Sequence, residues 1–158
     1  MTYTGYYESP IGILEITADE EALTGLSITE EKGYSRENEI IRKTVSQLKE
    51  YFSGKRESFE LPLKFNTTAF RKRVYEALMT VPYGSTVSYK DLTIMAGNRR
   101  GYQATGQAMH FNPIMIVVPC HRVINNDGSI GGYGSHIEVK KYLLRMEGGW
   151  KMDYNKQV

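Results

Sequence analysis

Three side chains capable of chemistry follow one another after Pro119: Cys120, His121 and Arg122. Cys120 is the only cysteine in the chain. A thiolate is a strong nucleophile, a nearby imidazole can take the thiol proton, and a guanidinium supplies a fixed positive charge. The triplet therefore indicates nucleophilic chemistry at Cys120. If Cys120 is considered without its neighbours, the alternative is that it is a small hydrophobic residue buried in the core.

The preceding residues predict the element that positions the thiol. Residues 114–118 (IMIVV) form a short, β-branched run that is typical of a buried strand. Pro119 cannot donate a ladder hydrogen bond, so the pairing should stop there. Neighbouring side chains of a strand point to opposite faces. We therefore expect His121 to reach Cys120 only if the chain turns after Pro119 or a water molecule lies between them.

The composition is that of a globular domain, with 158 residues, 41% of them hydrophobic and 24% charged. A single cysteine cannot form an internal disulfide, which favours a reducing compartment. No apolar run is long enough for a membrane span, and residues 1–12 do not have the pattern of a secretion signal. The histidines and the cysteine do not have zinc-ligand spacing. We expect a prokaryotic cytoplasmic protein with no metal and no cofactor.

Charge is distributed unevenly along the chain. Residues 1–63 contain 7 Lys or Arg against 12 Asp or Glu, whereas residues 64–158 contain 13 against 6. A basic second part indicates a polyanionic partner such as a nucleic acid. The alternative is ordinary charge scatter.

The first part is expected to be a small α/β unit. Residues 2–9, 12–18 and 23–28 resemble strands of an antiparallel meander. A helix follows that ends at Gly54, with an apolar face made by Ile41, Val45, Leu48 and Phe52. Pro62 marks a boundary, which gives two domains, 1–63 and 64–158.

The second part is expected to be mainly helical. A helix runs from a cap at Thr67 or Thr68 to about Val81. Ser88 and Asp91 form a capping box for another helix, which ends at Gly97. A further helix over 99–111 completes a helix-turn-helix. It is rich in small residues, which implies either close contact with DNA or tight packing on another element. A last helix ends at Glu147, where a carboxylate opposes the helix dipole.

Residues 66–149 resemble the O6-alkylguanine-DNA alkyltransferases, also called methylated-DNA–protein-cysteine methyltransferases. The resemblance rests on the active-site motif PCHRV at 119–123 and on matches in the family's order and spacing at Val87-Ser-Tyr-Lys, Ala96-Gly-Asn98, Ala108-Met109, Asn112-Pro113, Ile124, Gly128, Gly132-Tyr133 and Leu143-Leu144-Arg-Met-Glu147-Gly148. Residues 1–63 are similar to the family's N-terminal lobe in layout only.

The resemblance implies a fold and an activity. The fold is α/β, with an N-terminal antiparallel sheet and helix and a C-terminal lobe containing a winged-helix-like helix-turn-helix. The activity is DNA repair by a monomer that binds double-stranded DNA in the minor groove and flips out O6-methylguanine, or less readily O4-methylthymine. The alkyl group then passes irreversibly to Cys120. Flipping is required because the reacting carbon is inaccessible inside the base stack.

The family's functional residues map onto this chain one by one. Cys120 matches the nucleophile, His121 the base that acts through a water, and Glu147 the carboxylate that orients the histidine. Asn112 matches the asparagine that ties the recognition helix to the active-site strand, and Tyr89 the tyrosine that donates a proton or hydrogen bond to the purine. Met109, Met115, Val123, Tyr133 and Gly134 match the substrate pocket, while Arg122 is expected to be structural.

Gln103 departs from the family pattern, which usually has an arginine there that enters the stack in place of the flipped base. Glutamine supplies no charge and a weaker stacking plane. The other residues expected to contact DNA are Arg99, Arg100, Tyr102, Ala104 and Thr105. Of these, Tyr102, Arg99 or Arg100 can substitute for the missing arginine.

Three other functions compete with alkyl transfer. A non-catalytic module that binds alkylated DNA keeps the DNA-binding lobe, but in such relatives the cysteine is replaced. A winged-helix regulator explains the helix-turn-helix and the basic charge, but not the Pro-Cys-His-Arg motif. A cysteine hydrolase would turn over repeatedly, whereas an alkyl acceptor reacts once.

Overall fold

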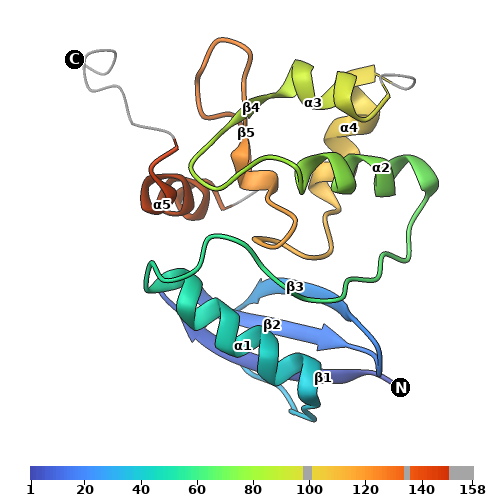
Figure 1. Cartoon of the computed structure of the whole chain (residues 1–158), viewed down its shortest axis with the longest axis vertical. Coiled ribbons are helices and arrows are strands. Elements are labelled where there is room, and N and C mark those ends of the chain that lie inside the picture. The colour runs from blue at the N-terminus through green and yellow to red at the C-terminus, as the bar shows by residue number, and fades with distance from the viewer. Residues whose placement is uncertain (98–100, 134–135, 150–158) are drawn as a thin grey trace.

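The computed structural model of the protein describes residues 1–97, 101–133 and 136–149, and it begins with a three-stranded antiparallel sheet. The strands are β1 (Tyr3–Ser9), β2 (Gly12–Ala18) and β3 (Leu23–Thr29), paired in that order. The helix α1 (Glu39–Phe52) packs against β1 and β2 (Figure 1). The predicted meander and helix are confirmed, and Gly54 adopts a left-handed φ of 78° just after the helix.

The buried face of α1 differs slightly from the predicted one. Ile41 and Leu48 are fully buried, as expected, but Val45 and Phe52 are only partly buried. Thr44 and Tyr51, each one position earlier in the chain, are fully buried in their place. Because adjacent positions on a helix are 100° apart, this change rotates the buried face by a fraction of a turn. It also turns Tyr51 toward the rest of the molecule.

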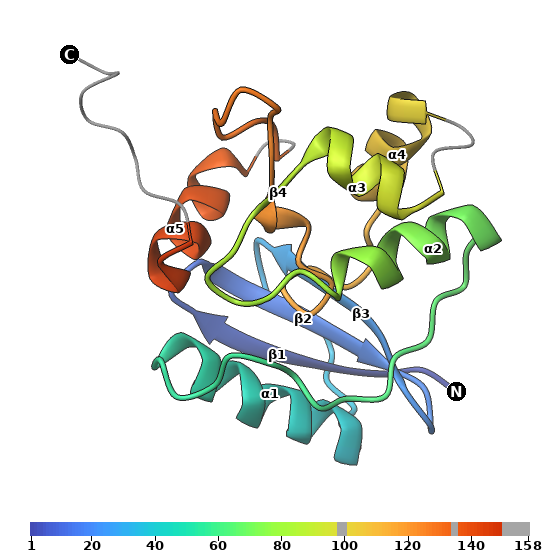
Figure 2. The same cartoon turned by 45° about the horizontal axis from the view of Figure 1, so that its top comes forward.

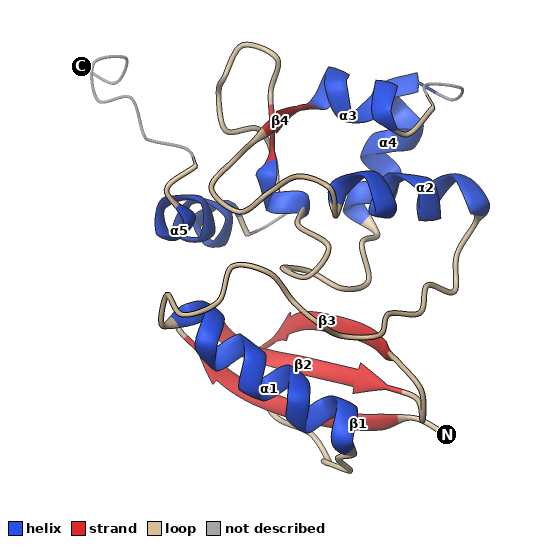
Figure 3. Cartoon of the chain, viewed as in Figure 1, coloured by secondary structure: helices blue, strands red, loops and turns tan. Residues whose placement is uncertain are grey.

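The remaining elements are mainly helical, and most strand residues lie in the N-terminal sheet (Figure 3). The helices are α2 (Ala69–Leu78), α3 (Tyr89–Met95), α4 (Gly101–His110) and α5 (Ile137–Glu147). Two short strands, β4 (Val87–Ser88) and β5 (Val123–Ile124), pair in parallel. The expected α/β fold class is confirmed. The helix α2 has the predicted cap at Thr68 but ends three residues before Val81, which is nevertheless buried.

The helices α2, α3 and α4 contact one another, and α3 and α4 form the predicted helix-turn-helix. Figure 2 shows these three helices together on one side of the molecule and α5 on the other. Ser88 caps α3 by accepting a hydrogen bond from the Asp91 amide at 3.0 Å. Within the described residues, no helix has the length and apolar character needed to cross a bilayer.

The predicted strand at 114–118 is wrong: this segment is a buried turn. Only Ile114 forms a strand-like bridge, to Leu26 of β3. Ile116 has a left-handed φ of 71°, and the Val118 amide bonds to the Ile114 carbonyl at 2.9 Å. The apolar run reflects burial on all sides, and burial alone does not distinguish a strand from a turn. The chain then continues into the 3-10 turn η1 (Cys120–Arg122).

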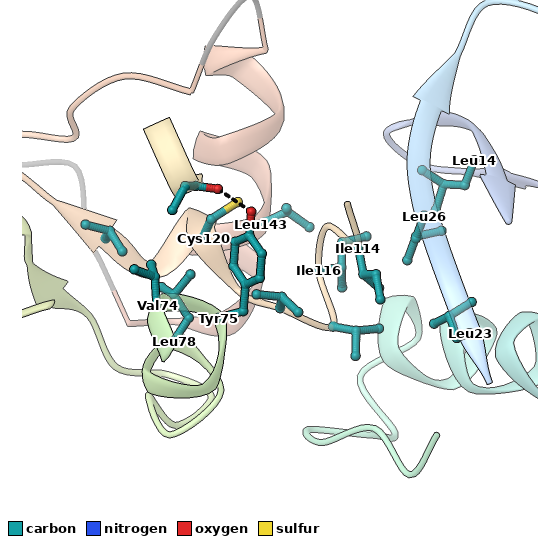
Figure 4. Close-up of a cluster of buried hydrophobic side chains, with 14 of the residues drawn as sticks. Leu14, Leu23, Leu26, Val74, Tyr75, Leu78, Ile114, Ile116, Cys120 and Leu143 are labelled. Atoms are coloured by element: carbon teal, nitrogen blue, oxygen red, sulfur yellow. Dashed lines mark hydrogen bonds between the residues drawn. The ribbon is translucent and has the colours of Figure 1, made fainter. Parts of the chain in front are cut away.

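This turn joins the two parts of the core. In Figure 4, Ile114 and Ile116 lie between Leu26 of β3 on one side and the region of Cys120 on the other. Backbone hydrogen bonds reinforce the junction, since the Leu26 amide donates to Pro113 and the Met115 amide donates to Leu26. The sheet edge is thereby paired with the segment that carries the cysteine.

Candidate active site

Asn112 holds Cys120 in place. Its side-chain nitrogen donates to the Cys120 sulfur at 3.2 Å and to the Val118 carbonyl at 2.8 Å. Its side-chain oxygen accepts from the Ile114 amide at 3.0 Å. Asn112 lies two residues after the end of α4, so a single amide connects that end of the helix, the buried turn and the thiol. This arrangement is more specific than an ordinary Asn-Pro turn.

The Cys120 thiol is 8% exposed, and burial raises its pKa. The hydrogen bond from Asn112, the nearby Tyr133 hydroxyl and the positive charge of Lys140 oppose this effect without cancelling it. The sulfur is therefore a neutral thiol at rest, and its use as a nucleophile requires a base to remove its proton.

His121 is fully buried and pairs with Glu147, with 2.8 Å between Nε2 and Oε2. Burial lowers the pKa of His121 even though Glu147 acts in the opposite direction, so the ring is neutral at rest. If Nε2 carries the proton that faces the carboxylate, Nδ1 is left as the basic nitrogen. Nδ1 has no hydrogen-bond partner among the described residues, and none of their hydrogen bonds joins His121 to Cys120.

Glu147 accepts hydrogen bonds from three side chains. Arg122 donates from Nε to Oε1 at 2.8 Å and from Nη2 to Oε2 at 3.1 Å. Tyr51 donates its hydroxyl to Oε2 at 2.5 Å. Burial would raise the pKa of Glu147, but the bonds from His121 and Arg122 outweigh it and lower the pKa to about 2. Glu147 is therefore an anion despite its burial.

The end of α5 is fixed against the turn that follows α2. Arg122 Nη1 donates to the Val81 carbonyl at 2.7 Å. Gly149 lies so close to the backbone of Gly84 that a Cβ at 149 would clash with it. The carboxylate at the C-terminus of α5, which is unfavourable for the helix dipole, is thus held by a rigid cationic environment.

Cys120 lines a cavity of about 510 Å³. Of the predicted pocket residues, Met109, Met115, Val123 and Tyr133 line the same cavity, as does Tyr89. Gly134 lies outside the described residues. The cavity extends to residues 26–28 of β3. Its volume lies within the range of small-molecule sites, so it has room for an extruded base.

The outer face of α4 carries two of the predicted DNA-binding residues. Tyr102 is 51% exposed, Gln103 is also exposed, and both line a second hollow beside Tyr89. Ala104 is partly buried and lines another hollow, next to α2. Thr105 is fully buried, so its prediction as a DNA-contacting side chain is corrected: it faces the core. Its hydroxyl donates to the Gly101 carbonyl at 3.2 Å. Arg99 and Arg100 lie outside the described residues.

Packing accounts for a small residue in the middle of α4. The Tyr89 hydroxyl donates to the Tyr102 carbonyl at 2.5 Å and lies directly over Gly106. A Cβ at 106 would be closer to that hydroxyl than atoms can approach. The glycine therefore allows Tyr89 to lie against α4 at the edge of the cavity.

Two residues of the site do not figure in the sequence predictions. Lys140 is 2% exposed and donates to the carbonyls of Val123 at 2.6 Å and Gly132 at 3.2 Å. Burial lowers its pKa to about 8. The sequence does contain a signal for Lys140, because a lysine two turns before Glu147 falls on the same, inner face of the predicted last helix. Tyr51 had no local signal, because it reaches Glu147 from α1, 96 positions away.

Comparison with known proteins places this geometry in a family. Residues 69–149 match the family model of the 6-O-methylguanine DNA methyltransferase DNA-binding domain, and residues 2–65 match the model of the ribonuclease-like domain of the same proteins. A methylated-DNA–protein-cysteine methyltransferase from Methanosarcina barkeri is 40% identical over 152 residues, covering 92% of this chain and 96% of that protein.

Solved structures agree. The crystal structure of the O6-methylguanine methyltransferase of Mycobacterium tuberculosis superimposes with a TM-score of 0.84 at 34% identity, covering 100% of both chains. Its complex with DNA gives a TM-score of 0.82 at 37% identity, covering 90% of this chain and 91% of that one. The two family models together span residues 2–149 with a single gap, and the relatives match the chain in length. The chain therefore belongs to the 6-O-methylguanine DNA methyltransferase family.

Proposed function

We propose that this protein repairs double-stranded DNA by flipping out O6-methylguanine and transferring the methyl group irreversibly to Cys120. A single observation carries the proposal: a buried thiol held by Asn112 lines a base-sized cavity, and the hydrogen-bonded pair of His121 and Glu147 lies next to it in the chain and in the core. O4-methylthymine is a weaker substrate of the same site. The protein acts as a monomer in the prokaryotic cytoplasm, where the chromosome lies.

The transfer is a displacement at the methyl carbon. His121 takes the thiol proton through a bridging water, and Glu147 stabilises the resulting imidazolium. The sulfur attacks the methyl carbon, the S–C bond forms as the C–O6 bond breaks, and the electron pair remains on the purine. The purine anion then takes a proton from water to give guanine, and the imidazolium returns the thiol proton to water, so that no net charge is left. The thioether is stable, so each molecule reacts once.

The other residues bind the substrate or hold the site together. Tyr89 donates a hydrogen bond to the extruded purine, and the residues lining the cavity enclose the base. Arg122 is structural, since it anchors Glu147 to the Val81 carbonyl. The exposed face of α4 enters the minor groove, where Gln103 or Tyr102 fills the space left by the flipped base. Residues 64–158 thus form the DNA-binding and alkyl-acceptor domain, and residues 1–63 form the N-terminal domain.

Intact-mass spectrometry after incubation with a duplex containing one O6-methylguanine tests this function. We expect a gain of one methyl group that saturates at one per protein and maps to Cys120. The matched control is Cys120→Ser, which should bind the duplex without gaining mass. An unchanged wild-type mass with tight, lesion-selective binding would instead identify a recognition module. Repeated turnover with a free thiol would identify a hydrolase.

A further inference from the structure

The N-terminal part of the chain contributes a side chain to the buried ion cluster behind the cysteine. Tyr51 is the penultimate residue of α1 and is fully buried. Its hydroxyl donates to Glu147 Oε2, the same oxygen that faces His121 Nε2. Its ring is held by neighbouring aromatic rings of Phe52, Phe59 and Tyr83, at centroid distances of 5.1, 5.4 and 6.2 Å.

A purely structural role does not explain where this hydroxyl points. A buried tyrosine needs one hydrogen-bond acceptor, and a backbone carbonyl suffices, as Tyr75 shows by donating to the Ala108 carbonyl at 2.7 Å. Tyr51 instead donates to Glu147, the carboxylate that contacts the proposed base. Burial and the neighbouring Glu147 anion both raise the pKa of Tyr51, so it remains a neutral donor at every physiological pH.

We propose that Tyr51 is a positioning residue of the transfer reaction, which sets how strongly Glu147 attracts the proton of His121. This inference rests on the proposed function and extends it to the N-terminal part of the chain. Tyr51 and His121 share one oxygen, so each donor draws on the same negative charge. With the phenol present, less of that charge is available to stabilise the imidazolium.

The direction of the effect follows from this competition. Removing the phenol hydroxyl leaves Oε2 with one donor fewer, which makes it a stronger acceptor for His121. The charged imidazolium gains more than the neutral ring, so the pKa of His121 should rise. Such a variant keeps every other ionisable side chain that faces this pair. These side chains are Cys120 and Arg122 of η1, Lys140 of α5, Tyr83 after α2, and Tyr133.

The test compares full-length Tyr51→Phe with wild type and with Tyr6→Phe. The phenylalanine keeps the ring contacts and removes only the hydroxyl. Tyr6→Phe is the matched control, because it removes a phenol–carboxylate bond of 3.1 Å, to Glu15 within the sheet, and leaves the carboxylate that pairs with His121 untouched. The His121 ring is titrated by NMR. Single-turnover methyl transfer from an O6-methylguanine duplex is measured between pH 5 and 9.

We expect the pKa of His121 to rise by about half to one unit in Tyr51→Phe, and the acid limb of the rate profile to move up with it. Tyr6→Phe should match wild type in both. An unchanged or lowered His121 pKa in a folded Tyr51→Phe protein overturns the inference. Absence of methyl transfer by wild type overturns the proposed function instead, while the NMR titration still tests the Tyr51–Glu147–His121 coupling.

Discussion

At the scale of single residues, burial controls the protonation states of the site. Burial raises the pKa of Cys120 and lowers that of His121, so both are neutral at rest. In the proposed mechanism, a thiolate–imidazolium pair therefore forms only when the proton moves. Glu147 is already an anion, and in that mechanism it stabilises the charge that His121 acquires. An idle site of this kind limits oxidation or alkylation of the thiol before a damaged base arrives.

The depressed pKa of Glu147 predicts acid sensitivity. Its pKa is about 2 in the folded protein against 4.5 as the ordinary value, so its contribution to stability is present above pH 4.5 and is lost as the pH falls toward 2. The shift corresponds to roughly 3 kcal/mol of unfolding free energy. His121, whose pKa is also lowered, begins to lose its contribution at a higher pH, with the same sign.

Urea unfolding at pH 7, 4.5 and 3 measures this effect, with Glu147→Gln as the comparison. We expect wild type to lose more stability than the variant on acidification. At pH 7 the variant should be less stable, because Arg122 remains buried without its anion. Equal losses in both proteins would show that Glu147 is not the group that titrates.

At the scale of elements, the two faces of α4 have different roles: one packs against the core and the other is exposed. Its inner face is fixed by packing, since Thr105 and Ala108 are fully buried and Gly106 accommodates Tyr89. Its outer face carries the exposed side chains of Tyr102 and Gln103. The small residues of this helix are therefore explained by packing on α3 at Gly106, whereas the outer face remains available for DNA.

A double-mutant cycle between Gly106 and Tyr89 tests the packing. Gly106→Ala should destabilise wild type by about 1–3 kcal/mol, because its Cβ collides with the Tyr89 hydroxyl. In the Tyr89→Phe background the same change should cost less or stabilise by up to about 1 kcal/mol, the helix-propensity gain of alanine. Thermal unfolding measures all four proteins. Additive effects would mean that the hydroxyl does not occupy the space over Gly106.

Gln103 lies on the outer face of α4, where the family usually has an arginine. Gln103→Arg should raise the rate of repair in duplex DNA by about tenfold, because a guanidinium stacks and neutralises charge where glutamine does not. Reaction with free O6-benzylguanine, which requires no flipping, serves as the control and should change little. If both rates rise equally, position 103 does not act on base extrusion.

At the scale of the whole molecule, the acidic and basic parts of the chain are joined through the edge of β3. Segments 62–64 and 113–115 both bond to that strand. The N-terminal sheet therefore supports the cysteine segment from behind, while the basic charge belongs to residues 64–158, with 13 Lys or Arg against 6 Asp or Glu. From this charge asymmetry we expect the helical part to meet the phosphates.

Affinity for an undamaged duplex should fall steeply with salt, by about 10³-fold between 50 and 200 mM if six phosphates are contacted. Cys120→Ser is suitable for the measurement, since it does not react. Arg71 of α2 lines the hollow that also contains Ala104 of α4. Arg71→Gln should reduce the slope of log K against log salt by about one. Lys43→Gln on α1 should leave it unchanged. Equal slopes for both variants would argue against α2 as a phosphate contact.

Local sequence was sufficient for the family and for most of the elements. The meander, the caps at Thr68 and Ser88 and the helix-turn-helix follow from patterns within about ten residues, and the motif at 119–123 indicates the family and predicts the roles proposed for Cys120 and its neighbours. These features depend on short-range hydrogen bonds and on side-chain types, both of which can be read directly along the chain.

Three features depended on long-range packing. The turn at 114–118 requires a left-handed Ile116, which residue preferences disfavour and which the surrounding core imposes. The inward orientation of Thr105 depends on how α4 docks against α2 and α3. The bond from Tyr51 to Glu147 joins residues 96 positions apart. No local pattern encodes such a contact, because it exists only once the sheet and the helical part have packed together.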